Sequence, residues 1–519
     1  MSTIILAEVT AHDPATSTDR VERVGSVAYN HPSAPGHYWD AFSTGAVPSF
    51  LRREIFKDGA TFGAGTNDHG EIRLTNLDGR YDWLADAWTD GRPVRVLIGD
   101  DAAAYDTFAE VFNGVVAAVE VDIAEVIIRI HDAFTEALDQ PLSEAVYAGT
   151  GGVEGGDTLK DQAVAVVVGP AFNIPLEVTD AALGVCVACD AGPLTFDVVK
   201  VRGDVITPGV AQASLAALLS TAPTPGTYDW YPGTATERPT VRFGSAIDGQ
   251  VAANVTTGAT VADRTAAKGF EVLGARAGIV FRAADLTALD LANAAECGGW
   301  WRGTDKIRQA LDDFAATVGA GYWQDGTGEW RVQRIEAPGT PVATFASLTL
   351  DRPGALNEGD ILSIKPLFTG RAEGGLQPWE VTLRCARNYT VQSKDSLADA
   401  AGTAEEKDRL ATEWLEASTG EDAAVRAAHP LSVPMVIDTL FAHRADAEAE
   451  AHRRRDLYAD RRRFLTGVTM TPVLTGLVDL GVTVRVEHPR LGLSAGRNVR
   501  VPGMHLNLLA LTADMTVWG

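Results

Sequence analysis

The sequence predicts a mainly β, multi-domain protein that combines β-barrel domains with small α+β helix-hairpin modules and one long C-terminal helix. Short segments in which apolar and polar residues alternate recur along the chain, and in one of them Val126, Ile128 and Ile130 share a face. Turn-forming residues are frequent, with 51 Gly and 24 Pro. A chain of 519 residues is too long for one hydrophobic core, so we expect about three or four domains.

Composition excludes several function classes. Apolar residues make up 46% of the chain and charged residues 22%, as in ordinary globular proteins. The formal net charge is −25, which gives no general attraction to DNA or to anionic membranes. No apolar run reaches the ~18 residues of a membrane span, and the N-terminus has no basic leader. Four cysteines in 519 residues make no disulfide framework, so we expect synthesis in a reducing cytoplasm.

The first half of the chain is expected to hold two β-rich domains. Residues 1–145 predict an N-terminal β-barrel-like domain, because an apolar run at 4–9, a strand at 92–99 and a hairpin around Asp122 follow one another. Residues 146–264 predict a second β-rich domain that opens with the Gly-rich loop Gly149–Gly156. We interpret that loop as a connection, because it lacks the Gly-Lys-Ser/Thr ending of a phosphate-binding loop.

The second half is expected to hold an α+β module and another barrel. Residues 265–336 predict a helix followed by a tight hairpin, because apolar residues at helical spacing up to Val318 precede an Asp325-Gly326 turn. Residues 337–519 predict a second β-barrel-like domain with helical insertions at 405–417 and 439–464. For the longer insertion, Asp438 or Thr439 is the expected N-cap. Its arginines are expected to pair with carboxylates on a solvated face.

The cysteines are the only candidate metal ligands. Cys186 and Cys189 have the spacing at which two thiolates can bind the same metal ion. A site would need Cys297 and Cys385 to approach them in space and to close a zinc or iron–sulfur site. We expect buried structural cysteines and no bound cofactor, with the four-cysteine site as the alternative.

No catalytic constellation is expected, and the chain is interpreted as a non-enzyme. Nucleophile-elbow and zinc-protease motifs are missing, and the ten histidines are scattered. Carboxylate pairs such as Asp78 and Asp82 fit a turn better than glycosidase chemistry. The tryptophans are expected to pack in cores and interfaces, with sugar stacking as an alternative for Trp83, Trp88, Trp300, Trp301, Trp323 and Trp330.

Several segments, in this order, resemble the tail-tip and baseplate hub proteins of tailed bacteriophages, including siphophage and gene-transfer-agent-like tail proteins. The regions that carry the resemblance span about half of the chain, and the matching segments within them are Glu71–Asp82, Asp90–Gly99, Phe112–Val116, Ile130–Ala133 with Leu138–Leu142, Arg387–Gln392, Leu457–Arg461, Leu480–Val484, Arg490–Leu493 and Val517–Gly519.

The resemblance implies a structural virion protein at the distal end of a tail. Such a protein forms a hub ring, expected to be a trimer, with tube-type β-barrel domains that continue the tail tube. It anchors tip or fibre proteins, contacts the distal tail protein, and lets DNA pass through its lumen during genome ejection without specific binding. The expected location is the virion tail, after synthesis in the host cytoplasm. The family supplies no catalytic residues, and some of its members hold an iron–sulfur cluster on four cysteines.

Two other functions stay open. The first is a receptor- or carbohydrate-binding tail protein, which would present exposed aromatic residues. The second is a cell-wall glycoside hydrolase that uses paired carboxylates.

Overall fold

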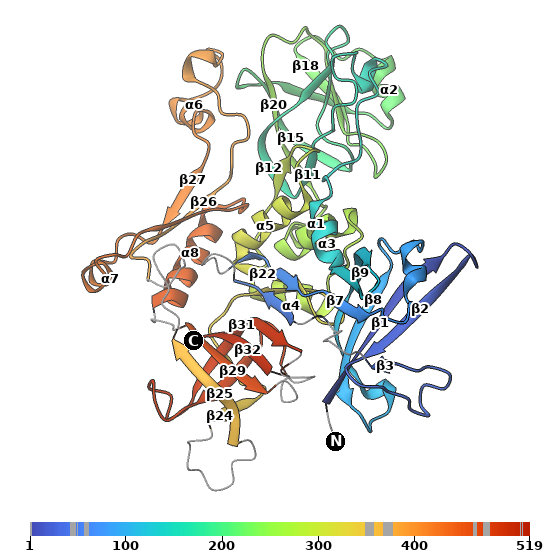
Figure 1. Cartoon of the computed structure of the whole chain (residues 1–519). Helices are drawn as coiled ribbons and strands as arrows, with labels where there is room; N and C mark the ends of the chain where they lie inside the picture. Colours follow the sequence, from blue (N-terminus) through green and yellow to red (C-terminus); the bar gives the residue numbers. More distant parts are fainter. Residues whose placement is uncertain are drawn as a thin grey trace. The chain divides into compact units, whose positions relative to one another are not determined.

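A computed structural model describes residues 3–41, 48, 50–56, 62–347, 358–366, 377–459, 464–470, 478–508, 510 and 512–519 (Figure 1). The fold is mainly β and multi-domain, which confirms the predicted fold class. The chain forms two compact units, each built from separate stretches of sequence. Unit 1 comprises 1–136, 321–376 and 460–519, and unit 2 comprises 137–320 and 377–459. The four narrower domain ranges expected from the sequence stay a prediction.

The N-terminal part of unit 1 is a seven-stranded sheet with the order β3-β2-β1-β8-β9-β10-β7. All consecutive neighbours except β2 and β3 are antiparallel. Alternation of buried and exposed side chains along β10 places Val126, Ile128 and Ile130 in the core, as the sequence predicts. The strands are β1 Thr3–Asp13, β2 Thr18–Gly25, β3 Asp40–Ala41, β7 Ile72–Thr75, β8 Pro93–Asp100, β9 Ala109–Val121 and β10 Glu125–His131.

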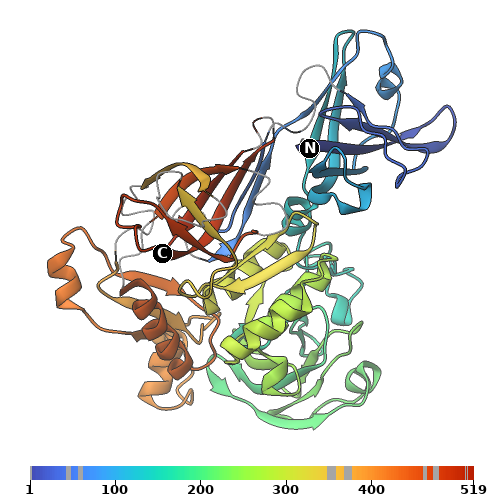
Figure 2. The same ribbon diagram turned by 90° about the horizontal axis from the view of Figure 1, so that it is seen from below.

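Unit 1 also contains a closed six-stranded barrel (Figure 2). Its order is β30-β24-β25-β29-β32-β31, and pairing of β31 with β30 closes the ring. The far half of β31 pairs with β4, which in turn pairs with β6, so a hairpin from the start of the chain extends the barrel wall. The strands are β4 Phe50–Glu54, β6 Thr66–His69, β24 Thr344–Ser347, β25 Glu358–Pro366, β29 Phe464–Met470, β30 Thr483–Glu487, β31 Arg497–Asn507 and β32 Thr512–Trp518.

The predicted helix and hairpin at 304–332 are present. Helix α5 (Ile307–Val318) ends at Gly319, which adopts the left-handed conformation that glycine accepts without steric cost. Strands β22 (Ala320–Gln324) and β23 (Trp330–Arg334) follow and pair with each other, and β22 also pairs with β5 (Gly63–Ala64). The carboxylate of Asp325 accepts backbone N–H groups of Thr327 and Glu329 at 3.0 Å and thereby fixes the tight turn.

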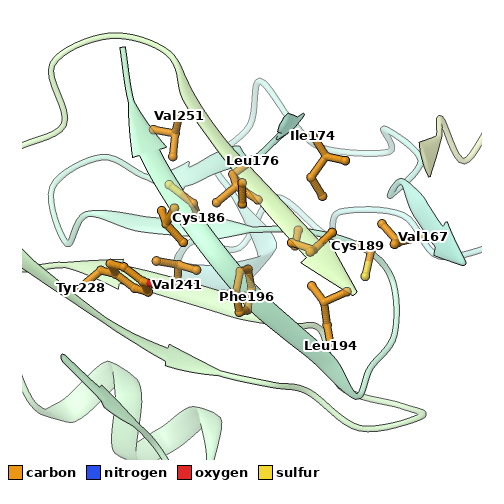
Figure 3. Packing of buried hydrophobic residues seen from close by; sticks show 14 of the residues in the cluster. Val167, Ile174, Leu176, Cys186, Cys189, Leu194, Phe196, Tyr228, Val241 and Val251 are labelled. Atoms are coloured by element: carbon orange, nitrogen blue, oxygen red, sulfur yellow. The ribbon is translucent and has the colours of Figure 1, made fainter. Parts of the chain in front are cut away.

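One half of unit 2 is built on two sheets that share a core (Figure 3). The first has the order β12-β20-β15-β16 and the second β13-β14-β19-β18-β17. Leu176, Phe196 and Val241 lie among the buried side chains between them. The strands are β12 Pro170–Pro175, β13 Glu177–Asp180, β14 Val185–Val187, β15 Leu194–Val201, β16 Asp204–Val205, β17 Thr207–Ala211, β18 Thr227–Tyr231, β19 Thr240–Phe243 and β20 Val251–Thr257, with helix α2 at Leu215–Ser220.

The other half of unit 2 is helical around two small sheets. Helices α3, α4 and α5 pack together, and α8 covers the sheet β27-β26-β28. Strand β11 (Val166–Val168) pairs with β21 (Gly299–Trp301). The remaining elements are α1 Ala133–Asp139, α3 Ala266–Arg276, α4 Ala283–Ala292, β26 Val381–Cys385, α6 Ala404–Leu410, β27 Leu415–Ser418, α7 Ala423–Ala428, β28 Met435–Asp438 and α8 Arg444–Ala459.

The prediction of a helix over 405–417 is wrong for its second half. Helix α6 ends at Leu410, and Leu415–Ser418 form strand β27 against β26, with Ala417 opposite Leu383. Pairing that buries Ala417 outweighs the helical propensity of this segment.

The helix predicted over 439–464 is shorter. Asp438 ends strand β28 and α8 begins at Arg444, so neither expected N-cap residue starts the helix. The Thr439 hydroxyl instead donates to the carbonyl of Arg384 at 2.7 Å. Phe464 belongs to β29. Arg461, Arg462 and Arg463, which the predicted helix included, lie outside the described residues.

Candidate functional site

The four cysteines, which the sequence offered as metal ligands only in the alternative reading, are all buried in unit 2, and none forms a disulfide. Cys186 and Cys189 belong to the core shared by the two large sheets (Figure 3). Cys297 lies opposite Phe441 in an isolated bridge, and Cys385 ends β26. Among the described residues, no three His, Cys, Asp or Glu side chains are arranged to hold a metal ion.

Burial disfavours the thiolate form of these cysteines. Desolvation raises the pKa of Cys186 and of Cys189 to about 12. It also raises the pKa of Cys297, where nearby carboxylates add to the effect, and the pKa of Cys385. Because the thiolate is the metal ligand and the nucleophile, the thiols in this arrangement act as small apolar core groups.

The sequence did not indicate a polar pocket in unit 1, lined by β4, β6, β9 and the turn after β22. Burial lowers the pKa of His69, and the charges of Asp132 and His131 act on it with opposite signs. Asp132 is only 3% exposed, and its Oδ2 atom has no hydrogen-bond partner. The pocket is lined by Leu51, Arg52, Arg53, Asn67, Asp68, His69, Val111, Phe112, Asn113, Asp132, Gln324, Asp325 and Gly326.

This pocket brings together groups of both charges. Burial favours the neutral form of the His69 imidazole, and Arg53 lies 3.1 Å from Asp479. Arg52 and Arg53 line the pocket together with Asp68, Asp132 and Asp325, so the lining carries charges of both signs.

A second unanticipated carboxyl group lies on α5 in unit 2. Burial raises the pKa of Asp313 to about 6, although the Trp301 indole N–H donates to it at 2.7 Å. The charge of Arg387, which lies 5.0 Å from the ring centres of both Tyr389 and Trp414, lowers that pKa. Burial of this carboxyl group therefore disfavours its charged form.

The carboxylates that the sequence singled out stabilise a turn. Arg80 donates to Asp78 at 2.7 Å, and these hydrogen bonds hold the pKa of Asp78 below its usual range. Asp82 accepts a 2.7 Å hydrogen bond from Asn76. The Gly149–Gly156 loop contains four glycines with positive φ, and Arg238 holds it through Glu154 at 3.0 Å.

The arginines of α8 were predicted to lie on a solvated face, and this prediction is wrong for Arg454. Arg454 and Glu450 on α8 are each 2% exposed and lie 2.8 Å apart. The Arg454 guanidinium donates to the carbonyl groups of Ala316 and Thr317 at the end of α5. A cation at a helix C-terminus is favoured by the helix dipole, so this pair joins two helices. By contrast, Arg455 pairs with Asp456 at the surface.

Three of the six tryptophans considered as sugar-stacking candidates pack inside. Trp301, Trp323 and Trp330 are buried. Trp88 is 60% exposed, and its ring stacks on His12 with 5.0 Å between ring centres. Asp19 holds the His12 ring at 2.7 Å, so the exposed indole is fixed.

The fold defines a multi-domain, mainly β protein with a closed barrel. No known protein family and no curated protein matches the chain. No helix in the described parts of the chain is long and apolar enough to cross a membrane.

Three solved structures are similar to the chain at low identity. The 43 kDa tail protein of prophage MuSo2 from Shewanella oneidensis has 10% identity and a TM-score of 0.44 over 99% of this chain and 98% of its own. A tail protein from Neisseria meningitidis MC58 has 12% identity and a TM-score of 0.42 over 100% and 97%. A chain from the virion of a native gene transfer agent particle has 14% identity and a TM-score of 0.39 over 74% and 91%.

Proposed function

We infer that this chain is a structural virion protein of a phage-type tail, which forms a hub ring at the distal end of the tail tube. The closed six-stranded barrel of unit 1 is the observation that carries this inference. Closure removes the free strand edges of the barrel itself, and the β4–β6 hairpin extends its wall outwards from β31. A closed wall of this kind suits a rigid component of a tube.

The sequence supports the same role. Its resemblance to tail-tip proteins runs in order from Glu71 to Gly519 and includes segments of both units. The net charge of −25 suits a lumen through which DNA slides, because basic side chains would hold the phosphates. In this role the chain would form a homo-oligomer, which we expect to be a trimer, and bind the distal tail protein and tip or fibre proteins.

Electron cryo-microscopy of intact particles tests this function. We expect density for the chain as a closed ring of three copies around the axis at the distal tail end. Density at the periphery of the tail, or its absence from purified particles, would contradict the proposal. Light scattering of the purified chain gives a second readout, because a mass of about three chains supports the ring.

Carbohydrate recognition is a second candidate, favoured by Trp88. The free face of a fixed, 60% exposed indole is a platform on which a sugar ring can stack. Binding of host cell-wall polysaccharide that is lost in Trp88→Ala and kept in Tyr38→Ala, which changes another exposed aromatic side chain of unit 1, would support this function. Equal polysaccharide binding by both variants would contradict carbohydrate recognition by Trp88.

A further inference from the structure

Two large apolar side chains project from neighbouring loops at one end of the N-terminal sheet. Ile123 is 83% exposed and Leu77 is 77% exposed. Among the described residues of unit 1, no other large apolar side chain reaches these values. Ile123 lies in the turn between β9 and β10, and Leu77 lies in the turn that follows β7. We call these two turns the apolar tip.

Asn76 holds the two turns together. It is 1% exposed and donates from its backbone N–H to the carbonyl of Ala124 at 2.9 Å. Its Nδ2 group donates to the carbonyl of Asp122 at 3.0 Å and to Asp82 at 2.7 Å. Its Oδ1 atom accepts the backbone N–H of Tyr81 at 3.0 Å. Both turns are therefore fixed before any partner arrives, which reduces the entropy lost on binding.

The surroundings of the tip are acidic. Segments 71–82 and 120–129 carry six carboxylates and three arginines, a net charge of −3. The arginines are already paired within the chain: Arg73 with Glu71, Arg80 with Asp78, and Arg129 with Glu120. Asp78, Glu120 and Glu125 keep side-chain exposures of 55%, 54% and 44%. An incoming surface therefore meets two apolar side chains within an acidic rim.

This charge selects the class of partner. A second copy of a chain with net charge −25 would be repelled at an acidic tip, and so would an anionic membrane. A different protein that presents an apolar hollow rimmed with Lys or Arg matches both features of the tip. We propose that Leu77 and Ile123 insert into such a hollow on another tail protein. The proposal rests on the tail function inferred above, which supplies the particle in which the partner is sought.

Site-specific photo-cross-linking in purified particles tests this interface. Ile123 is replaced with p-benzoylphenylalanine, and Val205, which is 60% exposed in unit 2, is replaced in a control chain. After irradiation, we expect mass spectrometry to join position 123 to one other tail protein, at a peptide with apolar and basic residues. Linkage of position 123 to a second copy of this chain, or to no protein, would overturn the proposal. A chain missing from the particles before irradiation would instead contradict the tail function.

Charge reversal tests the basic rim. Changing Asp78→Lys together with Glu125→Lys should reduce the cross-linking yield at position 123 by about tenfold, because unlike charges become like charges. The matched control is Asp248→Lys, where the side chain is 94% exposed in unit 2. An unchanged yield in the double variant would overturn a basic partner. Flotation with phosphatidylcholine vesicles is the last control, and binding lost in Ile123→Asn would assign the tip to a membrane instead.

Discussion

The side-chain amide of Asn173 donates a 2.8 Å hydrogen bond to Oδ1 of Asn388, which lies 215 residues further along the chain. Both residues are almost fully buried, at 4% and 2% exposure. Asn173 lies in a bulge of β12 with a φ of 53°, a conformation that asparagine tolerates better than most residues. Asn388 also donates to the carbonyl groups of Leu410 and Thr412. The pair thus joins the two-sheet half of unit 2 to the segment that follows β26.

We expect Asn388→Ala to lower the free energy of unfolding by about 2–4 kcal/mol, because several buried polar groups lose their partner at once. Urea unfolding followed by circular dichroism measures this. The control Asn113→Ala changes an exposed amide and should cost under ~0.5 kcal/mol. Equal losses for the two variants would show that the buried network does not stabilise unit 2.

The buried pair of Arg454 and Glu450 should be strongly coupled. Arg454→Met removes the 2.8 Å contact with Glu450 and the donor to the end of α5, while Arg453 keeps its 2.7 Å contact with Glu450, so we expect a loss of roughly 2–4 kcal/mol. The double change Arg454→Met and Glu450→Leu should cost less than the sum of the single changes. Additive losses in a double-mutant cycle would refute the coupling, and Arg455→Ala at the surface should be nearly neutral.

Asp313 should make stability fall as pH rises. Its pKa is raised from 3.8 to about 6, so its protonated form stabilises the fold below pH 4, and that contribution is lost as pH rises through 6. Two pKa units correspond to about 3 kcal/mol as an upper bound. Asp313→Asn should therefore be more stable than the natural chain at pH 7.5 and should lose this advantage at pH 4.5. The midpoints of urea unfolding, measured for both chains at the two pH values, test this prediction. Asp248→Asn is the control at an exposed position.

His69 should make stability rise as pH rises, which is the reverse of the effect of Asp313. Burial lowers its pKa from 6.5, so the neutral ring is favoured in the folded chain, and its contribution is present above pH 6.5 and lost as pH falls below it. We expect His69→Gln to flatten the pH dependence of unfolding between pH 7 and 5. His488→Gln, outside the pocket, should leave that dependence unchanged. A natural-chain profile retained in His69→Gln would contradict this assignment.

The cysteines should be unreactive in the folded chain. Because all four thiols are buried and their pKa values are raised, a thiol-specific reagent at pH 7.5 should label none before unfolding and four after it. Rapid labelling of the native chain would contradict this packing. Visible absorption or bound zinc in the purified protein would instead support the four-cysteine site.

Local patterns in the sequence predicted the elements whose formation depends on neighbours along the chain. The spacing of Ile307, Leu311, Phe314 and Val318 indicated α5, and the Asp325-Gly326 turn indicated the hairpin that follows. Period-two alternation placed β10, and the mainly β class followed from many such segments. These signals are local because helix and hairpin hydrogen bonds join residues a few positions apart.

The sequence could not show which distant residues meet. Ala417 joined a strand because β26 was available to pair with it, and Arg454 became buried because the end of α5 lies against α8. The sequence pattern around Asn173 does not predict that this residue contacts Asn388. The environment of Asp132 likewise forms only because β4, β6 and β9 line one pocket. Burial and pKa shifts depend on neighbours from other segments. The sequence therefore determined the class of fold and its local elements, while the tertiary structure alone decided which polar groups are buried, paired or left at the surface.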